Sequence, residues 1–277
     1  MTTRVPKFWG LHAEPSLRLN WFLAALPFML LIGSYLAVAH YRVSQNPAEK
    51  ITPTISKMVH SIYSLAFTKD VRSGDYLLIR DTLSSLRRIS LGIAFSTVLG
   101  LIFGLNTGLF PGMRALLLSF VTFFAYIPCL ALLPILFIIF GIEETAKIVL
   151  IFIGTCPMII RDLCLTSQKT TKEQITKALT LGATQFSLVY RVVLPQVMPR
   201  LIDAVRLSLG SAWLFLIAAE YIASTDGLGY RIGLMRRYSA MDVIIPYVLW
   251  ITFLSFTMDW LLRFIMNWRY PWYTTKN

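Results

Sequence analysis

The chain has 277 residues, of which 56% are hydrophobic and 14% charged, and its formal net charge at pH 7 is +12. This composition is too apolar for a soluble domain, and the length allows about six spanning helices of roughly 20 residues each. It therefore indicates an all-α membrane protein. Lys and Arg residues lie between the apolar stretches, so we interpret the positive charge as topology and lipid-headgroup contacts, not nucleic-acid binding.

The N-terminal segment, residues 1–20, is polar and lacks a small-residue cleavage pattern, so we expect a cytoplasmic segment and no cleaved signal peptide. The first span is predicted over residues 21–39, with aromatic residues at both ends. Residues 41–80 are more polar, and apolar side chains recur at helical spacing within residues 55–63. That spacing predicts an amphipathic helix along the outer surface of the membrane.

The second span begins near residue 82 and has small residues on one stripe. They recur at every fourth position: Ser96, Gly100, Gly104 and Gly108. Small side chains let a second helix approach closely, so the stripe is predicted to be a packing face. A turn is expected over residues 106–112.

The third hydrophobic segment, residues 113–142, is longer than a membrane requires and contains Pro128 and Pro134. Each proline frees a backbone carbonyl, which a membrane tolerates only where protein or a water-filled path surrounds it. Two interpretations remain open, a broken helix that lines a translocation path and a simple kink. The fourth span is predicted over residues 148–160, with Arg161 and Asp162 at its end.

Residues 176–195 form a helix-patterned segment that is too polar for lipid. Apolar residues recur at helical spacing on both sides of Gly182, which predicts two short helices that meet at this glycine. Thr184 is expected to cap the second helix and Pro195 to stop it. Such a knob suits insertion into a groove on a soluble partner. The alternative is an ordinary amphipathic loop on the membrane surface.

The fifth span, predicted over residues 201–221, contains Ser208, Ser211, Trp213 and Glu220. A carboxylate within an apolar run is costly unless it is paired or wet, so Glu220 is a candidate site residue. A structural or gating role and a substrate-binding role both remain open for it. Residues 224–238 are expected to be a Gly-rich loop at the outer mouth, and the sixth span follows over residues 243–264.

Several chemistries find no support in the sequence. The three cysteines, Cys129, Cys156 and Cys164, lack metal-ligand spacing, so no metal site is expected. The phosphate-binding pattern Gly-x-x-x-x-Gly-Lys-Ser/Thr does not occur, and the histidines have no nearby nucleophile pattern. We therefore expect neither an enzyme nor a cofactor on this chain.

The spacing from Ala178 to Gly182 and then to Leu194-Pro195 resembles the EAA signature of bacterial ABC-importer permeases. The runs at residues 127–151 and 204–232 resemble the nitrate, sulfonate and taurine branch of that family, and together these motifs cover roughly residues 80–270. Thr176 and Lys177 stand where the family usually has Glu and Ala, which puts one polar contact of the coupling helix in doubt.

The resemblance implies a type I ABC importer permease fold with about six transmembrane helices and a cytoplasmic coupling helix. Residues 21–270 would form one permease domain, residues 166–200 its coupling loop and residues 271–277 a C-terminal tail. The expected coupling residues are Ala178, Leu181, Gly182, Ala183, Thr184, Leu194 and Pro195. The expected residues of the translocation pathway are Pro128, Pro134, Ser208, Ser211, Trp213 and Glu220.

The same resemblance implies a multi-pass protein of the bacterial inner membrane. Its expected partners are a second permease copy in a homodimer, two ATP-binding subunits that carry ATP and Mg, an extracytoplasmic substrate-binding protein and membrane lipids. The expected solute is small and polar: nitrate, taurine or another sulfonate, bicarbonate, or a urea- or guanidine-like compound. The alternative is a stand-alone secondary transporter or channel, which would be expected to show inverted repeats and intramembrane ionisable pairs.

Overall fold

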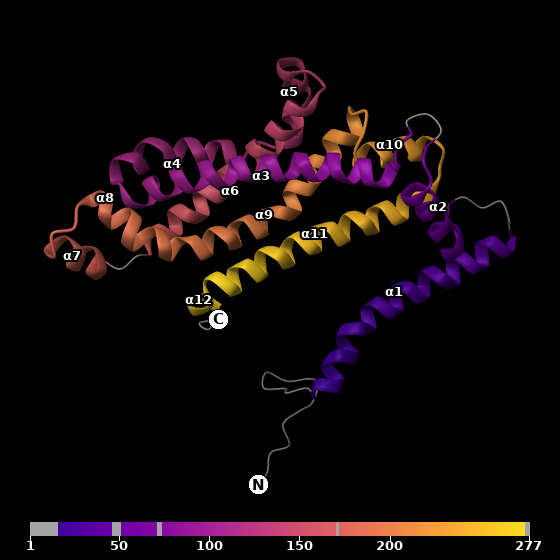
Figure 1. Cartoon of the computed structure of the whole chain (residues 1–277), viewed down its shortest axis with the longest axis horizontal. Coiled ribbons are helices and arrows are strands. Elements are labelled where there is room, and N and C mark those ends of the chain that lie inside the picture. The colour runs from indigo at the N-terminus through magenta and orange to yellow at the C-terminus, as the bar shows by residue number, and fades with distance from the viewer. Residues whose placement is uncertain (1–15, 46–50, 71–73, 170–171, 275–277) are drawn as a thin grey trace, which may run out of the picture.

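The computed structural model describes residues 16–45, 51–70, 74–169 and 172–274 (Figure 1). All regular elements in these ranges are helical, in the order α1 (Leu17–Gln45), α2 (Ile55–Phe67), α3 (Leu77–Leu109), α4 (Pro111–Ala125), the 3₁₀ turn η1 (Cys129–Leu132), α5 (Leu133–Phe140), α6 (Glu144–Gln168), α7 (Lys172–Thr180), α8 (Gln185–Ser187), the π-helical turn η2 (Leu188–Val193), α9 (Leu194–Ile222), α10 (Leu228–Arg237), α11 (Met241–Arg269) and α12 (Pro271–Thr274). The predicted all-α class is confirmed. The expectations for residues 1–15 and 275–277 lie outside the described residues.

Five helical stretches in the described part of the chain are long and apolar enough to cross a membrane. They are α1, α3, α6, the stretch from α8 through α9, and α11. The pair formed by α4 and the η1–α5 stretch passes the same test, but it is bent by 84°. At the break, Pro128 lies just before η1 and Pro134 lies in the first turn of α5. The helix is therefore broken and not simply kinked, and its role in lining a translocation path stays a prediction.

Two predicted boundaries were wrong. The fourth span does not end at Arg161 and Asp162, because α6 continues to Gln168. The turn expected over residues 106–112 shrinks to Phe110, which separates α3 from α4. Arg114 makes this sharp junction possible, since its guanidinium donates to the carbonyls of the last turn of α3 and supplies partners that a helix end lacks.

The small-residue stripe of α3 packs directly on α6. Its contacts are Gly92 with Ile151, Ser96 with Thr155, Gly100 with Ile159, Gly104 with Leu163 and Gly108 with Ser167. A Cβ added at the four glycines would lie only 2.5–2.7 Å from the facing side chain, so the predicted packing face is confirmed. Every pair has the sequence separation of 59 found for Ser96 and Thr155, which means that α3 and α6 run parallel. The chain must therefore return from one end to the other through α4, η1 and α5.

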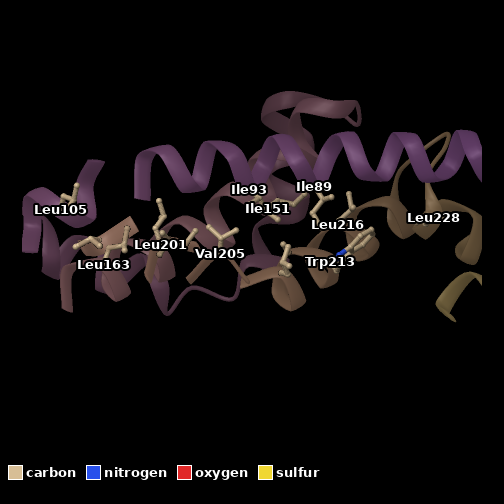
Figure 2. Packing of buried hydrophobic residues seen from close by; sticks show 14 of the residues in the cluster. Ile89, Ile93, Leu105, Ile151, Leu163, Leu201, Val205, Trp213, Leu216 and Leu228 are labelled. Carbon is tan, nitrogen blue, oxygen red and sulfur yellow. The ribbon is translucent and has the colours of Figure 1, made fainter. Parts of the chain in front are cut away.

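The main hydrophobic core joins α3, α6 and α9, and Figure 2 shows its side chains interleaved along the three helices. Ile89, Ile151 and Leu216 are completely buried there. The predicted amphipathic helix is α2, which packs on α11 and α3 and whose Ser61 hydroxyl donates to Asp242 at 2.6 Å. In contrast, Ala39 is the only buried residue of α1, which lies apart from the other helices in Figure 1.

Candidate functional site

The knob predicted around Gly182 is formed by α7 and α8. Gly182 has a φ of +82°, a conformation that glycine adopts without strain. The amide of Gly182 donates to the carbonyl of Leu179, and the amide of Ala183 donates to that of Ala178, both at 3.0 Å. This is the Schellman arrangement that ends a helix. The Thr184 hydroxyl then accepts from the amide of Ser187 at 3.2 Å, which starts α8 as the sequence predicted.

The prediction that Pro195 stops the second helix was wrong. The helical path continues from α8 through η2 into α9, and Pro195 lies in the first turn of α9. The amide of Leu194 donates five residues back to the carbonyl of Val189, so the backbone widens just before the proline. The π-helical turn accommodates the proline, which has no N–H to donate to the preceding turn. The knob is consequently joined to a span without a loop.

The tip of the knob is apolar and open. Leu181 is 89% exposed and Phe186 is 72% exposed, and the Phe186 ring lies 4.3 Å from that of Tyr190. Gly182 and Thr184 are exposed as well, whereas Ala178 and Ala183 are half-buried. Leu194 packs against the main core, and Pro195 is exposed. The knob lies next to the end of α3, and Phe110 and Phe186 line a groove between them.

The residues expected along the pathway fall in three separate places. Pro128 and Pro134 are at the break between α4 and α5, far along the chain from the others. Ser208 and Ser211 donate to carbonyls of their own helix, at 2.8 and 2.9 Å, as buried serines in helices often do. Trp213 lies in the wall between α9 and α11, and Glu220 belongs to a different cluster near the end of α9.

Glu220 is completely buried and bonded through both carboxylate oxygens. Arg88 donates to it at 2.7 Å, the Ser85 hydroxyl lies 2.8 and 2.9 Å from its two oxygens, and the amide of Gly229 donates at 2.9 Å. Since these partners come from α3 and α10, the carboxylate ties three helices together. Its bonds satisfy the requirement that a buried charge be paired.

Arg88 is the centre of a larger ionic group, which we call the Arg88 cluster and which consists of Ser85, Arg88, Glu144, Lys147, Glu220 and Asp226. The Arg88 guanidinium is 1% exposed and bonds the carboxylates of Glu144, Glu220 and Asp226. For Asp226, burial favours the protonated form, but the hydrogen bonds and charges of Arg88, Ser84 and Arg80 together outweigh this and hold the pKa of the carboxyl below its ordinary value. The second predicted span includes Arg88, but the sequence analysis gave Glu220 no partner, because the two residues are 132 positions apart.

The loop expected over residues 224–238 is instead the helix α10. Gly227, with a φ of +111°, turns the chain so closely over Glu220 that an added Cβ would lie 2.5 Å from the carboxylate carbon. The free amides at the start of α10 find acceptors on other helices: Leu228 donates to Ser85 and Gly229 to Glu220. Side chains of α3 and α9 thus supply the N-terminal cap that the local sequence lacks.

A second buried pair supports the same end of the bundle. Asp81 is completely buried and accepts from Arg231 of α10 at 2.8 Å and from the amide of Gly227 at 3.2 Å. The Tyr247 hydroxyl of α11 lies 3.3 Å from the same carboxylate. Five helices therefore meet at these two ionic groups, α3, α6, α9, α10 and α11.

A third charged group lies inside the spans and was missed in the sequence. Arg206 of α9 donates to Asp203 at 2.8 Å and to Asp259 of α11 at 2.9 Å, and Asp259 also accepts from Arg263 at 3.2 Å. The sequence contained the information to find this group, because Asp203, Arg206 and Asp259 fall within predicted spans. Charged residues inside a membrane span usually mark functional sites. Arg206 and Asp259 line a pocket of about 500 Å³ between α9 and α11, which we call the α9–α11 pocket.

The comparisons with known proteins agree on a family. The family model described as the inner membrane component of binding-protein-dependent transport systems matches residues 96–271. The taurine transport system permease protein TauC of Escherichia coli is 31% identical over 199 residues, which cover 72% of each chain. The bicarbonate transport system permease protein CmpB of Synechococcus elongatus is 27% identical over 195 residues, 69% of this chain and 70% of the relative.

Among solved structures, the chain is similar to one of the inward-facing MetNI methionine ABC transporter. The TM-score is 0.59 at 23% identity, and the match covers 69% of this chain and 95% of the other. This supports the type I importer fold that the sequence predicted. The chain is a member of the family of permease components of ABC transport systems, the branch that includes taurine, sulfonate and bicarbonate permeases.

Proposed function

We propose that this chain is the permease subunit of an ATP-driven importer that moves a small polar solute across the bacterial inner membrane by alternating access. The relatives are named for taurine, aliphatic sulfonates and bicarbonate, so we place the solute in this range of small oxygen-rich compounds. Two copies of the chain would form the pathway. Two ATPase subunits would bind ATP and Mg, and a substrate-binding protein would deliver the solute from outside.

The observation that carries this proposal is the open apolar knob at the end of a span. A side chain such as Leu181, exposed to 89% on a segment too polar for lipid, is suited to a groove on a soluble protein. The Schellman turn at Gly182 and the cap at Thr184 hold the two short helices of the knob at a fixed angle. We infer that this surface binds the ATPase.

The connection from the knob to the span suggests how force is transmitted. The helical stretch from Gln185 to Ile222 is continuous over 38 residues, and its far end holds Glu220 of the Arg88 cluster. A displacement of the knob would therefore move one helical unit along the bundle. Since Glu220 ties this unit to α3 and α10, we propose that the displacement reaches the other end as a rocking of packed helices.

The experiment that tests this function is a pull-down of the chain from detergent, followed by mass spectrometry and an ATPase assay of the recovered complex. We expect an ATPase subunit and a second copy of the chain, with ATP hydrolysis coupled to uptake in liposomes. Recovery of the chain alone, together with solute uptake that needs no ATP, would overturn the proposal in favour of a secondary transporter.

A glycine pair provides a matched test of the coupling surface. Gly182→Asp places a charge on the knob and strains a backbone at φ +82°, so we expect loss of ATPase association while the chain stays in the membrane. Gly74→Asp is the control, because Gly74 has a similar φ of +71° and open space around it but precedes α3 at the other end. Equal ATPase recovery by both variants would show that the knob is not the coupling site.

A further inference from the structure

The α9–α11 pocket is an open hollow in the middle of two apolar spans, and its lining mixes charged and polar side chains with apolar ones. Its volume of about 500 Å³ is typical of sites for small ligands. Polar or open positions come from both helices: Arg206, Gly210, Trp213, Thr252, Ser255 and Asp259. A charged side chain within a membrane span costs free energy, and such side chains usually mark functional sites. A pocket lined by them is therefore a better candidate for a binding site than the apolar pockets of the same chain.

Two features of the pocket have no packing explanation. Trp213 is only 5% exposed, and its indole Nε1 is buried. A buried donor normally has an acceptor, but this one has no hydrogen-bond partner among the described residues. Gly210 lies within a helix, where glycine is unfavourable, yet a Cβ built there would meet nothing within 4 Å. An unused donor and an unfilled space in one wall both suit an occupant that brings its own acceptor atoms.

The charges around the pocket indicate the class of this occupant. Arg206 and Arg263 balance Asp203 and Asp259, so the group has no net formal charge. Arg206 uses its Nε and Nη1 atoms for the two carboxylates, and the structure gives its Nη2 atom no partner in the described part of the chain. A balanced site with free donors beside a carboxylate complements a solute that carries both charges and is neutral as a whole.

We propose that the α9–α11 pocket binds the transported solute, a small zwitterion whose anionic oxygen group is held by Arg206 and Trp213 and whose cationic group is held by Asp259. This inference rests on the proposed function and adds a solute site within the permease itself. The Trp213 Nε1 atom is covered in the present conformation, so its ring has to turn towards the pocket to form the bond. Thr252 and Ser255 lie on the opposite wall and complete the polar lining.

The test is equilibrium binding of radiolabelled taurine, an amino sulfonate, to the purified full-length chain in detergent. Unlabelled taurine should displace the label at least ten-fold better than ethanesulfonate, which has the same anionic group but no amine. Absence of taurine binding would overturn the inference. Equal displacement by ethanesulfonate would overturn the zwitterion assignment, because the carboxylate of Asp259 would then have no role.

Three variants locate the site. Gly210→Leu fills the pocket and Arg206→Gln removes its cation, so each should weaken taurine binding at least ten-fold. Trp213→Phe keeps the ring and removes the unused donor, so it should weaken binding several-fold while the chain remains folded. Gly33→Leu in α1 is the matched control for Gly210→Leu, since Gly33 also has nothing within 4 Å of an added Cβ. Unchanged binding in Trp213→Phe and Gly210→Leu would place the site elsewhere.

Recovery of the ATPase separates this inference from the proposed function. A chain that brings down an ATPase but binds no taurine refutes the pocket assignment and leaves the permease function intact. If the wild-type chain brings down no ATPase, the proposed function itself is refuted, whatever the result of the taurine-binding experiment.

Discussion

The two ends of the bundle are built on opposite principles. At the end that holds the Arg88 cluster, buried charges from four helices satisfy one another, and Arg88 alone bonds three carboxylates. At the knob, two short helices are held by a glycine turn and one threonine cap, while their apolar side chains point outwards. The first end should therefore carry stability, and the second should carry an interaction.

The largest effect is expected from Arg88→Met. Removal of the guanidinium leaves Glu220 buried without its cation, and breaking such a buried pair costs about 3–5 kcal/mol of unfolding free energy. Reversible unfolding in detergent micelles measures this loss. Arg80→Met is the control, because Arg80 is largely exposed and its ion pairs contribute little. A loss of less than about 1 kcal/mol for Arg88→Met would contradict the structural role of this cluster.

The α3–α6 seam should be the next most sensitive region. Gly104→Val places a Cβ 2.7 Å from that of Leu163 and 3.2 Å from the carbonyl of Ile160, and overpacking of this kind costs about 1–3 kcal/mol. The same unfolding measurement applies. Gly33→Val, in open space on α1, controls for the poorer helix propensity of valine. Equal losses for the two variants would mean that the close helix contact contributes nothing.

A smaller and local effect is expected at the cap of the knob. Thr184→Ala removes the acceptor for the Ser187 amide, which costs about 1 kcal/mol of local helix stability. Faster hydrogen exchange in residues 185–190, without a change in global unfolding, should report it. Thr180→Ala is the control, since the Thr180 hydroxyl only donates to the carbonyl of Lys177. Unaltered hydrogen exchange in Thr184→Ala would show that the Thr184 hydroxyl does not stabilise the start of α8.

The smallest effect on stability, with a large effect on binding, is expected from Leu181→Ser. An exposed side chain contributes little to folding, so the unfolding free energy should change by less than about 0.5 kcal/mol. ATPase recovery should fall at least ten-fold in the pull-down. Leu17→Ser, at a position 78% exposed on α1, should leave recovery unchanged. If Leu181→Ser lowered the free energy of unfolding, the knob would contribute to stability as well, which would contradict the proposed difference between the two ends.

Much of the architecture was predictable because its causes are local. Hydrophobic runs of sufficient length predicted the spans, and the stripe of small residues predicted a packing face on α3, though not that α6 packs on it. The knob was predictable for the same reason, since a glycine turn and a threonine cap involve neighbouring residues. The error over residues 224–238 arose because contacts from elsewhere overrode a local breaker, since Ser85 and Glu220 cap α10. The error at Pro195 arose because the helix widens into a π-helical turn before the proline and continues.

The candidate sites divide in the same way. The glycine turn and threonine cap around Gly182 were recognisable from the sequence, whereas the partners of Glu220 were not, because Arg88 lies 132 residues away. The charged residues of the α9–α11 pocket could have been found as intramembrane charges, but not their pairing. Arg206 and Asp259 are 53 residues apart and meet only because α9 and α11 pack together.

The sequence by itself determined that this protein is a bundle of membrane-spanning helices with a knob on a segment too polar for lipid, because lipid forces each spanning backbone to satisfy its hydrogen bonds within its own segment. Only the tertiary structure decided that α3 and α6 run parallel, that the knob continues into α9, and that Arg88 bonds three carboxylates. The physical reason is that charge pairing and close packing depend on side chains distant in the chain, whose meeting follows from how the helices are arranged.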